Sequence, residues 1–440
     1  MRLRLSRTYA VAATGAWGAA LLQFLAGVIV VRALSPRDVG IFAFGTAIAT
    51  FVFGVLDLRI EEGLTQFLIR ERSAGRKEHL TSSLRYAVAI DVVSGLVILG
   101  LTLAFLAWAP VHLGHETALV AAIAAVGILI GISDGSFMAV LYAHQAFGWL
   151  SSYQIVSGVT RCVALLALDI NNAADAAWAV LLAQTATTAF VIMVVLARFR
   201  PRGVRGEALD VGDRRWLVRF SVHVALASAI ATVRTTATPL ILGAVGSKRQ
   251  VANARVAESP TRLLAVAAAP FRTILFPRLS SAWARRDRAD AQRVVRHYIL
   301  TTLIIGGGLG LPMALAIDFL LTTIYGPEYG HLERVGQFFV LAAVLDGVAG
   351  WQKVAPAALD RPWLRTFIVG GEAAVVVAVL ALLAPHYGPL GAAISAAIAG
   401  AASLAMGGYW LRPAFGEPSW RRSRPTENLA EKPRIARHSR

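Results

Sequence analysis

The sequence contains few charged residues and a single cysteine. Of its 440 residues only 16% are charged, whereas a soluble protein carries about a quarter. One cysteine, Cys162, excludes a disulfide within the chain. There is no Walker A loop, no His/Cys spacing typical of a metal site and no paired-aspartate cluster for magnesium-bound diphosphate. We therefore expect no ATP hydrolysis, no metal, no cofactor and no enzymatic activity.

Long apolar runs dominate the chain, which is 56% hydrophobic with a mean hydropathy of +0.61. A membrane-spanning helix needs roughly 20 mostly apolar residues. The runs are continuously apolar and rich in Ala, Leu and Gly, which favours helices over the alternating strands of a barrel. We predict an all-α integral membrane protein. The twelve predicted spans are 10–31, 40–58, 86–108, 118–142, 151–168, 176–197, 220–245, 252–277, 298–323, 335–352, 366–384 and 390–411.

Positive charge is segregated to alternate gaps between these spans. Of 43 Lys and Arg residues, 33 lie on the side of the N-terminus, five lie on the other side and five lie within spans. Cationic loops stay in the cytoplasm, so we expect both termini there and a multi-pass protein in the inner membrane of a bacterium. The net charge of +17 is spread over cytoplasmic segments. We therefore expect contact with anionic lipid headgroups and not with nucleic acid.

The chain divides near its midpoint into two similar halves. We predict a six-helix bundle over 1–197, a basic cytoplasmic linker over 198–219, a second bundle over 220–411 and a disordered basic cytoplasmic tail over 412–440. An offset of 212 residues superimposes the spans of the two halves. The same offset relates Ser35 to Ser247, Arg37 to Arg249, Val39 to Val251, Gly114 to Gly326, Glu116 to Glu328, Asp134 to Asp346 and Gly135 to Gly347. Parallel repeats of this kind place the substrate between the halves.

Arginines within the predicted spans indicate a site for an anion. Arg234 lies near the middle of the seventh span and Arg262 near the middle of the eighth, where Arg255, Glu258 and Arg262 share one helix face. Buried charges of this kind usually line a pathway or pair internally. We hypothesise that Arg234, Arg262 and Arg255 bind phosphate oxygens in a water-filled cavity. The alternative is that Glu258 pairs with Arg255 or Arg262 and locks the helix.

Other polar residues in the spans admit two interpretations each. Gln23 either faces the cavity or bonds to a neighbouring helix. Arg161 either takes part in function or is structural and pairs with a carboxylate on another helix. The acids Glu258, Asp134, Asp346 and Asp91 either couple transport to an ion or are paired structural acids near helix ends.

Three stretches resemble one family of transporters. They are Val31–Ala43, which contains Arg-Ala-Leu-Ser-Pro-Arg-Asp-Val-Gly, Ile324–Tyr329, and Tyr387–Ala393, which reads Tyr-Gly-Pro-Leu-Gly-Ala-Ala. In order and position they resemble the oligosaccharide-flippase branch of the multidrug/oligosaccharidyl-lipid/polysaccharide exporter superfamily. The exit from the second span, Leu58–Gly63, and the loop at Val251–Arg255 depart from the family pattern, so the gate is expected to differ.

The resemblance implies a V-shaped pair of six-helix bundles that alternate access. It implies a cargo of polyprenyl-diphosphate-linked oligosaccharide repeat units, flipped from the inner to the outer leaflet for surface polysaccharide biosynthesis, with a polysaccharide polymerase as a possible partner complex. In that fold, helices one, two, seven and eight line the cavity. Arg234, Arg255 and Arg262 fall on the seventh and eighth spans, whereas Arg161 on the fifth is less well placed.

Three alternatives remain open. A multidrug or toxin exporter of the same superfamily shares the fold, but its usually cationic cargo would favour a surplus of acids. A membrane polymerase or ligase of envelope glycan assembly usually needs a large outer loop, which this chain lacks. A non-transporting scaffold for glycan assembly is compatible with the sequence.

Overall fold

The protein is all-helical throughout the part of the chain that the structure describes. The computed structural model describes residues 2–73, 79–108, 113–199, 209–359 and 361–416. In these ranges eleven helical stretches are long and apolar enough to cross a membrane. The prediction of an all-α membrane protein is confirmed. In a bilayer, helices of this kind satisfy every backbone donor and acceptor internally.

The first half of the chain forms helices α1 to α9. They are α1 Arg2–Ala33, α2 Pro36–Leu56, α3 Ile60–Ser73, α4 His79–Trp108, α6 His115–Gly131, α7 Asp134–Ala143, α8 Phe147–Ala167 and α9 Ala173–Arg198. Helix α1 packs on α8, α2 on α6, and α9 on both α6 and α8. Helix α3 continues the second predicted span beyond a break and packs on α7 and α10.

The second half forms helices α10 to α17. They are α10 Val211–Val245, α11 Lys248–Glu258, α12 Thr261–Ala284, α13 Arg288–Leu315, α14 Ile317–Tyr325, the 3-10 helix η1 Pro327–Leu332, α15 Glu333–Ala358, α16 Pro362–Tyr387 and α17 Pro389–Gly416. Helix α15 packs on α12, α13 and α17, and α16 packs on α10 and α17. Helix α10 also packs on α2, so it links the two halves.

The eighth predicted span, 252–277, is interrupted in the structure. Helix α11 ends at Glu258 and α12 begins at Thr261, with Ser259 and Pro260 in a turn between them. Proline lacks the backbone N–H that would continue the helix. This segment is not among the eleven candidate spans, which accounts for the difference from the twelve predicted. The break lies directly beside Arg255 and Arg262.

The predicted linker and tail are partly helical. Helix α10 begins at Val211, where the Asp210 side chain accepts a hydrogen bond from the backbone N–H of Gly212. The predicted linker of 198–219 is therefore shorter than expected, and its residues 200–208 lie outside the described ranges. Helix α17 extends to Gly416, so the first residues of the predicted tail are helical. The disorder predicted for the rest of the tail falls on 417–440, outside the described residues.

Residues paired by the 212-residue offset occupy matching local structures. Ser35 caps the N-terminus of α2 and Ser247 caps that of α11, each accepting a hydrogen bond from the backbone N–H three residues later. Gly114 precedes α6 with φ of 82° and Gly326 precedes η1 with φ of 124°. Positive φ favours glycine because it has no Cβ. These four positions support a relationship between the halves at the level of local structure.

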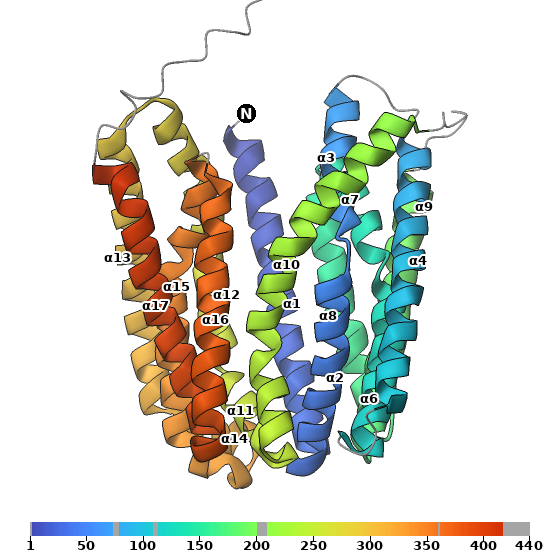
Figure 1. Cartoon of the computed structure of the whole chain (residues 1–440), viewed down its shortest axis with the longest axis vertical. Helices are drawn as coiled ribbons and strands as arrows, with labels where there is room; N and C mark the ends of the chain where they lie inside the picture. The colour runs from blue at the N-terminus through green and yellow to red at the C-terminus, as the bar shows by residue number, and fades with distance from the viewer. Residues whose placement is uncertain (1, 74–78, 109–112, 200–208, 360, 417–440) are drawn as a thin grey trace, which may run out of the picture.

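The two halves lie together at one end of the molecule and diverge toward the other (Figure 1). They diverge toward the N-terminal side, where the chain begins. The opposite end, which we call the far side, carries the junctions α1–α2, α10–α11 and α14–η1. There Arg32 donates hydrogen bonds to the carbonyl oxygens of Thr323, at 2.5 Å, and Ile324, at 2.7 Å. Side-chain to backbone bonds therefore tie the first half to the second at the far side.

Helices α2 and α11 make the closest contact across the far side. The Lys248 ammonium lies 3.7 Å from the centre of the Phe44 ring. Burial lowers the pKa of Lys248 to about 8, because leaving water disfavours the charged form. A Cβ at Gly40 would collide with the backbone carbonyl of Lys248. The approach of the two helices therefore depends on glycine at position 40.

Replacing Gly40 by valine is expected to force α2 and α11 apart and open the far side. Overpacking of this kind costs about 1–3 kcal/mol, so the closed state should lose a factor of roughly 5 to 150 in population. A cysteine at Thr46, which lines the central cavity, reports opening in a Cys162→Ser background. Its labelling by an impermeant thiol reagent from the far side should accelerate.

The matched control for this experiment is Gly100→Val. Gly100 lies on α4, and a Cβ there would meet no atom within 4 Å. Labelling in this control should equal that of the parent. Equal labelling in Gly40→Val and Gly100→Val would show that the α2–α11 contact does not control access.

Candidate functional site

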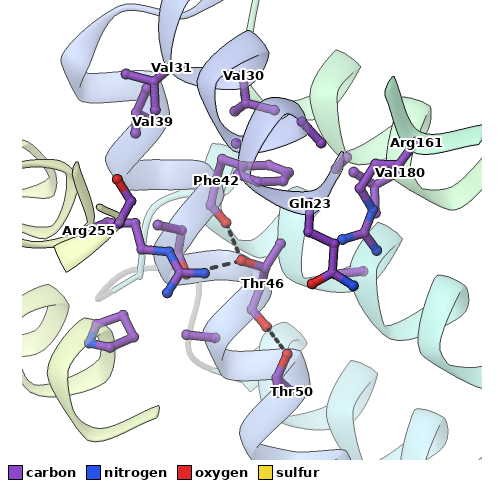
Figure 2. A pocket seen from close by; sticks show the side chains of 18 of the residues that line it. Gln23, Val30, Val31, Val39, Phe42, Thr46, Thr50, Arg161, Val180 and Arg255 are labelled. Atoms are coloured by element: carbon purple, nitrogen blue, oxygen red, sulfur yellow. Dashed lines mark hydrogen bonds between the residues drawn. The ribbon is translucent and has the colours of Figure 1, made fainter. Parts of the chain in front are cut away.

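A cavity of about 530 Å³ lies between the two halves. Helices α1, α2, α6, α8 and α9 line it from the first half, and α10, α11, α12 and α14 line it from the second. Among the residues that the structure describes, its lining contains three arginines, Arg161, Arg255 and Arg262, and no carboxylate. Gln23 and Arg161 lie on one side of it and Arg255 lies opposite (Figure 2). The charge of the lining is therefore positive, which suits an anionic ligand.

Arg255 and Arg262 flank the break between α11 and α12. Nη1 of Arg255 lies 3.6 Å from Oε2 of Glu258, and both side chains are nearly half exposed. The Arg262 side chain is exposed and forms no hydrogen bond or ion pair with any residue that the structure describes. The turn is held by a hydrogen bond between the hydroxyl groups of Ser259 and Tyr325. Glu258 therefore pairs with Arg255, at the long distance of 3.6 Å. Within the described residues it does not pair with Arg262.

Arg161 reaches the same cavity from α8. The Arg161 side chain forms no hydrogen bond or ion pair within the described part of the chain, so the partner carboxylate that was one of its two interpretations is not found there. Its neighbour Cys162 contacts the backbone carbonyl of Leu22, with Sγ 3.3 Å from the oxygen, which holds α8 against α1. Gln23 of α1 lies beside Arg161 (Figure 2). Of the two interpretations of Gln23, the structure supports the one that faces the cavity.

Arg234 is not among the residues that line the cavity. Its Nη1 lies 2.8 Å from Oε1 of Glu372 and 3.7 Å from Oδ1 of Asp346. The structure therefore places Arg234 in an ion-pair cluster, and not in the position expected for a substrate ligand. The expectation rested on its helical neighbours, which offer no carboxylate. Its partners come from α15 and α16, more than a hundred residues further along the chain.

Lys353 of α15 completes this cluster, although it lies outside the predicted spans, in the gap between 335–352 and 366–384. Its Nζ lies 2.5 Å from Oδ1 of Asp346 and 3.2 Å from Oε2 of Glu372. The hydroxyl of Ser403, on α17, lies 3.5 Å from Glu372. The signal available in the sequence was the spacing of Asp346 and Lys353, seven residues apart on one helix face. Two cations and two carboxylates make the cluster formally neutral.

The acids of the first half are held by hydroxyl and amide groups. Oδ2 of Asp134 accepts hydrogen bonds from the hydroxyl of Tyr153, at 2.8 Å, and from Nε2 of Gln184, at 2.9 Å. Gln184 itself lines the cavity, so Asp134 is one residue removed from it. Asp91 accepts a hydrogen bond from Ser136 at 2.6 Å, and neither residue lines the cavity. The two acids therefore differ in their connection to the site.

Two polar residues of α2 that line the cavity, Thr46 and Thr50, are not among the candidate site residues predicted from the sequence. Thr46 and Thr50 donate to carbonyl groups of their own helix, those of Phe42 at 2.7 Å and Thr46 at 2.8 Å (Figure 2). Their hydroxyl oxygens retain acceptor capacity toward a ligand. The available signal was a threonine every fourth residue on one face of an apolar helix.

The donor set of the cavity is suited to binding and not to metal chemistry. Within the described ranges no group of three or more His, Cys, Asp and Glu side chains is placed to hold a metal ion. Guanidinium groups bind phosphate and carboxylate oxygens in bidentate geometry. The remaining polar lining groups are hydroxyls and amides, which bond to neutral polar molecules such as sugars. The cavity can therefore accommodate an anion joined to a polar uncharged group.

A family model matches more than half of the chain. It is described as "Polysaccharide biosynthesis protein" and matches residues 6–283. A curated protein of Escherichia coli (strain K12), described as "Putative O-antigen transporter", is 23% identical over 316 residues. That match covers 71% of this chain and 73% of the relative.

Solved transporter structures share the fold. The lipid II flippase MurJ in an inward closed conformation has a TM-score of 0.74 at 12% identity, covering 91% of this chain and 87% of that one. An inward-facing multidrug resistance MATE family transporter of the MOP superfamily has a TM-score of 0.70 at 16% identity, covering 93% and 94%. At these identities the likeness establishes the arrangement of helices. The choice of cargo depends on the residues of the cavity.

Proposed function

Because the chain belongs to the polysaccharide biosynthesis protein family, in the oligosaccharide-flippase branch of its superfamily, we propose that it flips polyprenyl-diphosphate-linked oligosaccharide repeat units. The proposed direction is from the inner to the outer leaflet, by alternating access, for surface polysaccharide biosynthesis. The observation that carries the proposal is a cavity between the halves whose described lining residues include three arginines and no carboxylate. The O-antigen transporter and the lipid II flippase to which the chain is similar support the same class of function.

The diphosphate is the part of the cargo that the arginines recognise. Arg255 and Arg262 come from the second half and Arg161 comes from the first, so a bound diphosphate can contact both halves at once. Guanidinium groups fit phosphate oxygens bidentately, and charge-assisted bonds of this type contribute about 1.5–3 kcal/mol each. Gln23 and the hydroxyls of Thr46 and Thr50 remain available to the sugars. A ligand held from both sides favours the state in which the halves are close.

The sign of the cavity argues against the main alternative. A cation exporter needs carboxylates to replace the hydration of its cargo, and none occurs among the lining residues that the structure describes. Of the acids, Glu258 pairs with Arg255 and Asp134 is bonded to the lining residue Gln184. Neither neutralises Arg161 or Arg262 by direct contact within the described residues. A positive cavity therefore favours a diphosphate over a drug cation.

The proposed function is tested by deleting the gene and following the lipid-linked glycan. We expect undecaprenyl-linked repeat units to accumulate in the inner leaflet and surface polysaccharide to be lost, with both restored by the wild-type gene. Increased sensitivity to cationic drugs with intact surface polysaccharide would instead support the multidrug exporter. Neighbouring glycosyltransferase genes would add support for the flippase.

Asp134 is the acid that we propose to couple transport to protons. A ligand that draws the Gln184 amide into the cavity removes a donor from the Asp134 carboxylate, and a carboxylate that loses a hydrogen bond binds a proton more readily. Asp134→Asn keeps an acceptor for Tyr153 and Gln184 but cannot titrate. One proton crossing a one-unit pH gradient supplies about 1.4 kcal/mol. The variant should lose about tenfold in gradient-driven flipping, measured in proteoliposomes with and without the gradient.

The matched control for this prediction is Asp91→Asn. Asp91 is buried and bonded to Ser136, which has no part in the cavity lining. We expect its response to the gradient to equal that of the wild type. If both variants keep the wild-type response, protons do not act through Asp134, and sodium or the membrane potential becomes the candidate drive.

A further inference from the structure

A second hollow, of about 480 Å³, lies on the first half of the chain between α4, α7 and α9. It shares no lining residue with the arginine cavity. Leu84 and Val88 of α4, Phe137 and Val140 of α7 and Val195 of α9 form its apolar wall. Its volume is within the range of ligand sites, roughly 300–1,000 Å³. We call this hollow the lateral groove.

The lateral groove opens on a surface that faces acyl chains. Helices α4 and α9 both qualify as membrane spans. The lining residues Val92 of α4 and Leu196 of α9 are large, apolar and exposed, at 41% and 48%. In water such a surface would be an aggregation risk, but in a bilayer it lies against lipid. An occupant of the groove can therefore arrive by lateral diffusion in the membrane.

One end of the lateral groove is positively charged. Arg85 lines the groove near the start of α4 and is exposed. Arg198, in the last turn of α9, adjoins the lining residue Phe199. Neither arginine side chain forms a hydrogen bond or ion pair with the residues that the structure describes. Helix α4 starts and α9 ends on the N-terminal side (Figure 1), so both arginines are at the same end of the groove.

Among the described residues, the lining of the groove contains no carboxylate that competes for these arginines. Thr81 is the other polar side chain in this part of the lining. The nearby Glu71, on α3, is buried and lies 3.9 Å from Nε2 of His79 and 3.8 Å from Arg70. The start of α4 adds the partial positive charge of a helix N-terminus. The groove thus combines an apolar trough with a cationic end.

We propose that the lateral groove binds one anionic phospholipid. An acyl chain lies against Leu84, Val88 and Val140, and the phosphate lies at Arg85, with Arg198 beside it. A zwitterionic headgroup fits less well because its own cation would approach the arginines. The occupant packs on α7, the helix that begins with Asp134. This site is independent of the cargo proposed above, since it shares no lining residue with the arginine cavity.

Native mass spectrometry of the full chain in detergent tests the proposal. The protein is titrated separately with phosphatidylglycerol and phosphatidylcholine. We expect the wild type to bind one phosphatidylglycerol about fivefold more tightly than phosphatidylcholine, as one cationic contact near the membrane surface implies. Arg85→Gln should remove this preference. Ala89→Trp, which adds bulk to a lining position, should remove the tight site for both lipids.

Arg296→Gln is the matched control, because Arg296 is an exposed arginine on α13 that does not line the groove. It should bind both lipids as the wild type does. Equal binding of the two lipids by the wild type, or identical behaviour of Arg85→Gln and Arg296→Gln, would overturn the headgroup assignment. Retention of the tight lipid by a folded Ala89→Trp protein would overturn the groove itself. Val88→Phe serves as the filling variant if Ala89→Trp does not fold.

Discussion

Replacing Arg255 and Arg262 together by glutamine is expected to abolish flipping of the lipid-linked glycan. Each arginine–phosphate contact contributes about 1.5–3 kcal/mol, a factor of roughly 10 to 150 in affinity. Because both groups lie at one break and contact one ligand, their effects should not be additive. We expect a loss of at least about a hundredfold in flipping rate at limiting substrate. The measurement is the transfer of labelled polyprenyl-diphosphate oligosaccharide in proteoliposomes.

The type of charge matters as well as its presence. Lysine keeps the charge but lacks the planar fork, so the paired lysine variant should retain intermediate activity. Arg161→Gln alone should lower affinity for the same ligand from the other half of the protein. Arg249→Gln provides the control, because Arg249 is exposed on α11 and does not line the cavity. Wild-type transport by the double glutamine variant would remove these arginines from the site.

Replacing Glu372 by alanine is expected to destabilise the second half strongly. The Glu372 side chain is 3% exposed and contacts both Arg234 and Lys353. Its loss leaves two cations with Asp346 as their shared carboxylate. Removing one partner of a buried ion pair costs about 3–5 kcal/mol, because the remaining charge stays desolvated. The midpoint of thermal unfolding in detergent should fall by several degrees, and the protein level in the membrane should fall with it.

Two further variants decide whether the buried charge is the cause. Glu258→Ala removes a carboxylate that is 41% exposed, and its effect should be below about 1 kcal/mol. The double variant Arg234→Leu with Glu372→Leu leaves the Lys353–Asp346 pair intact and should recover part of the lost stability. An unfolding midpoint in Glu372→Ala equal to that of Glu258→Ala would show that the cluster does not stabilise the fold.

These two experiments separate arginines that looked alike in the sequence. Arg234 and Arg262 both lie near the middle of apolar segments. Variants of Arg234 should act mainly through stability, because its charge is already matched by Glu372. Variants of Arg262 should act mainly through substrate affinity, because no described carboxylate contacts it. The unfolding midpoint and the apparent substrate affinity, measured on the same preparations, distinguish the two roles.

The resemblance to the exporter family depends on three short motifs that occur in the family's order along the chain. Ser35 illustrates why: the serine caps α2, and its repeat partner Ser247 caps α11 in the same way. Local motifs of this kind encode helix ends, which depend on neighbouring residues alone. The break at Ser259–Pro260 is also encoded locally, because proline lacks the backbone N–H that would continue the helix.

The sequence by itself determined that this protein is a bundle of membrane helices, because a bilayer admits only segments that satisfy their own backbone and are apolar for about 20 residues. Only the tertiary structure decided which buried arginines share a cavity. Arg161 lines the cavity, whereas Arg234, which was predicted to line it, lies in an ion-pair cluster. The surroundings of both residues come from helices that are distant in the chain. Two buried charges pair only if their helices bring them within a few ångströms of each other. The hydropathy profile of the sequence gives no information on such distances.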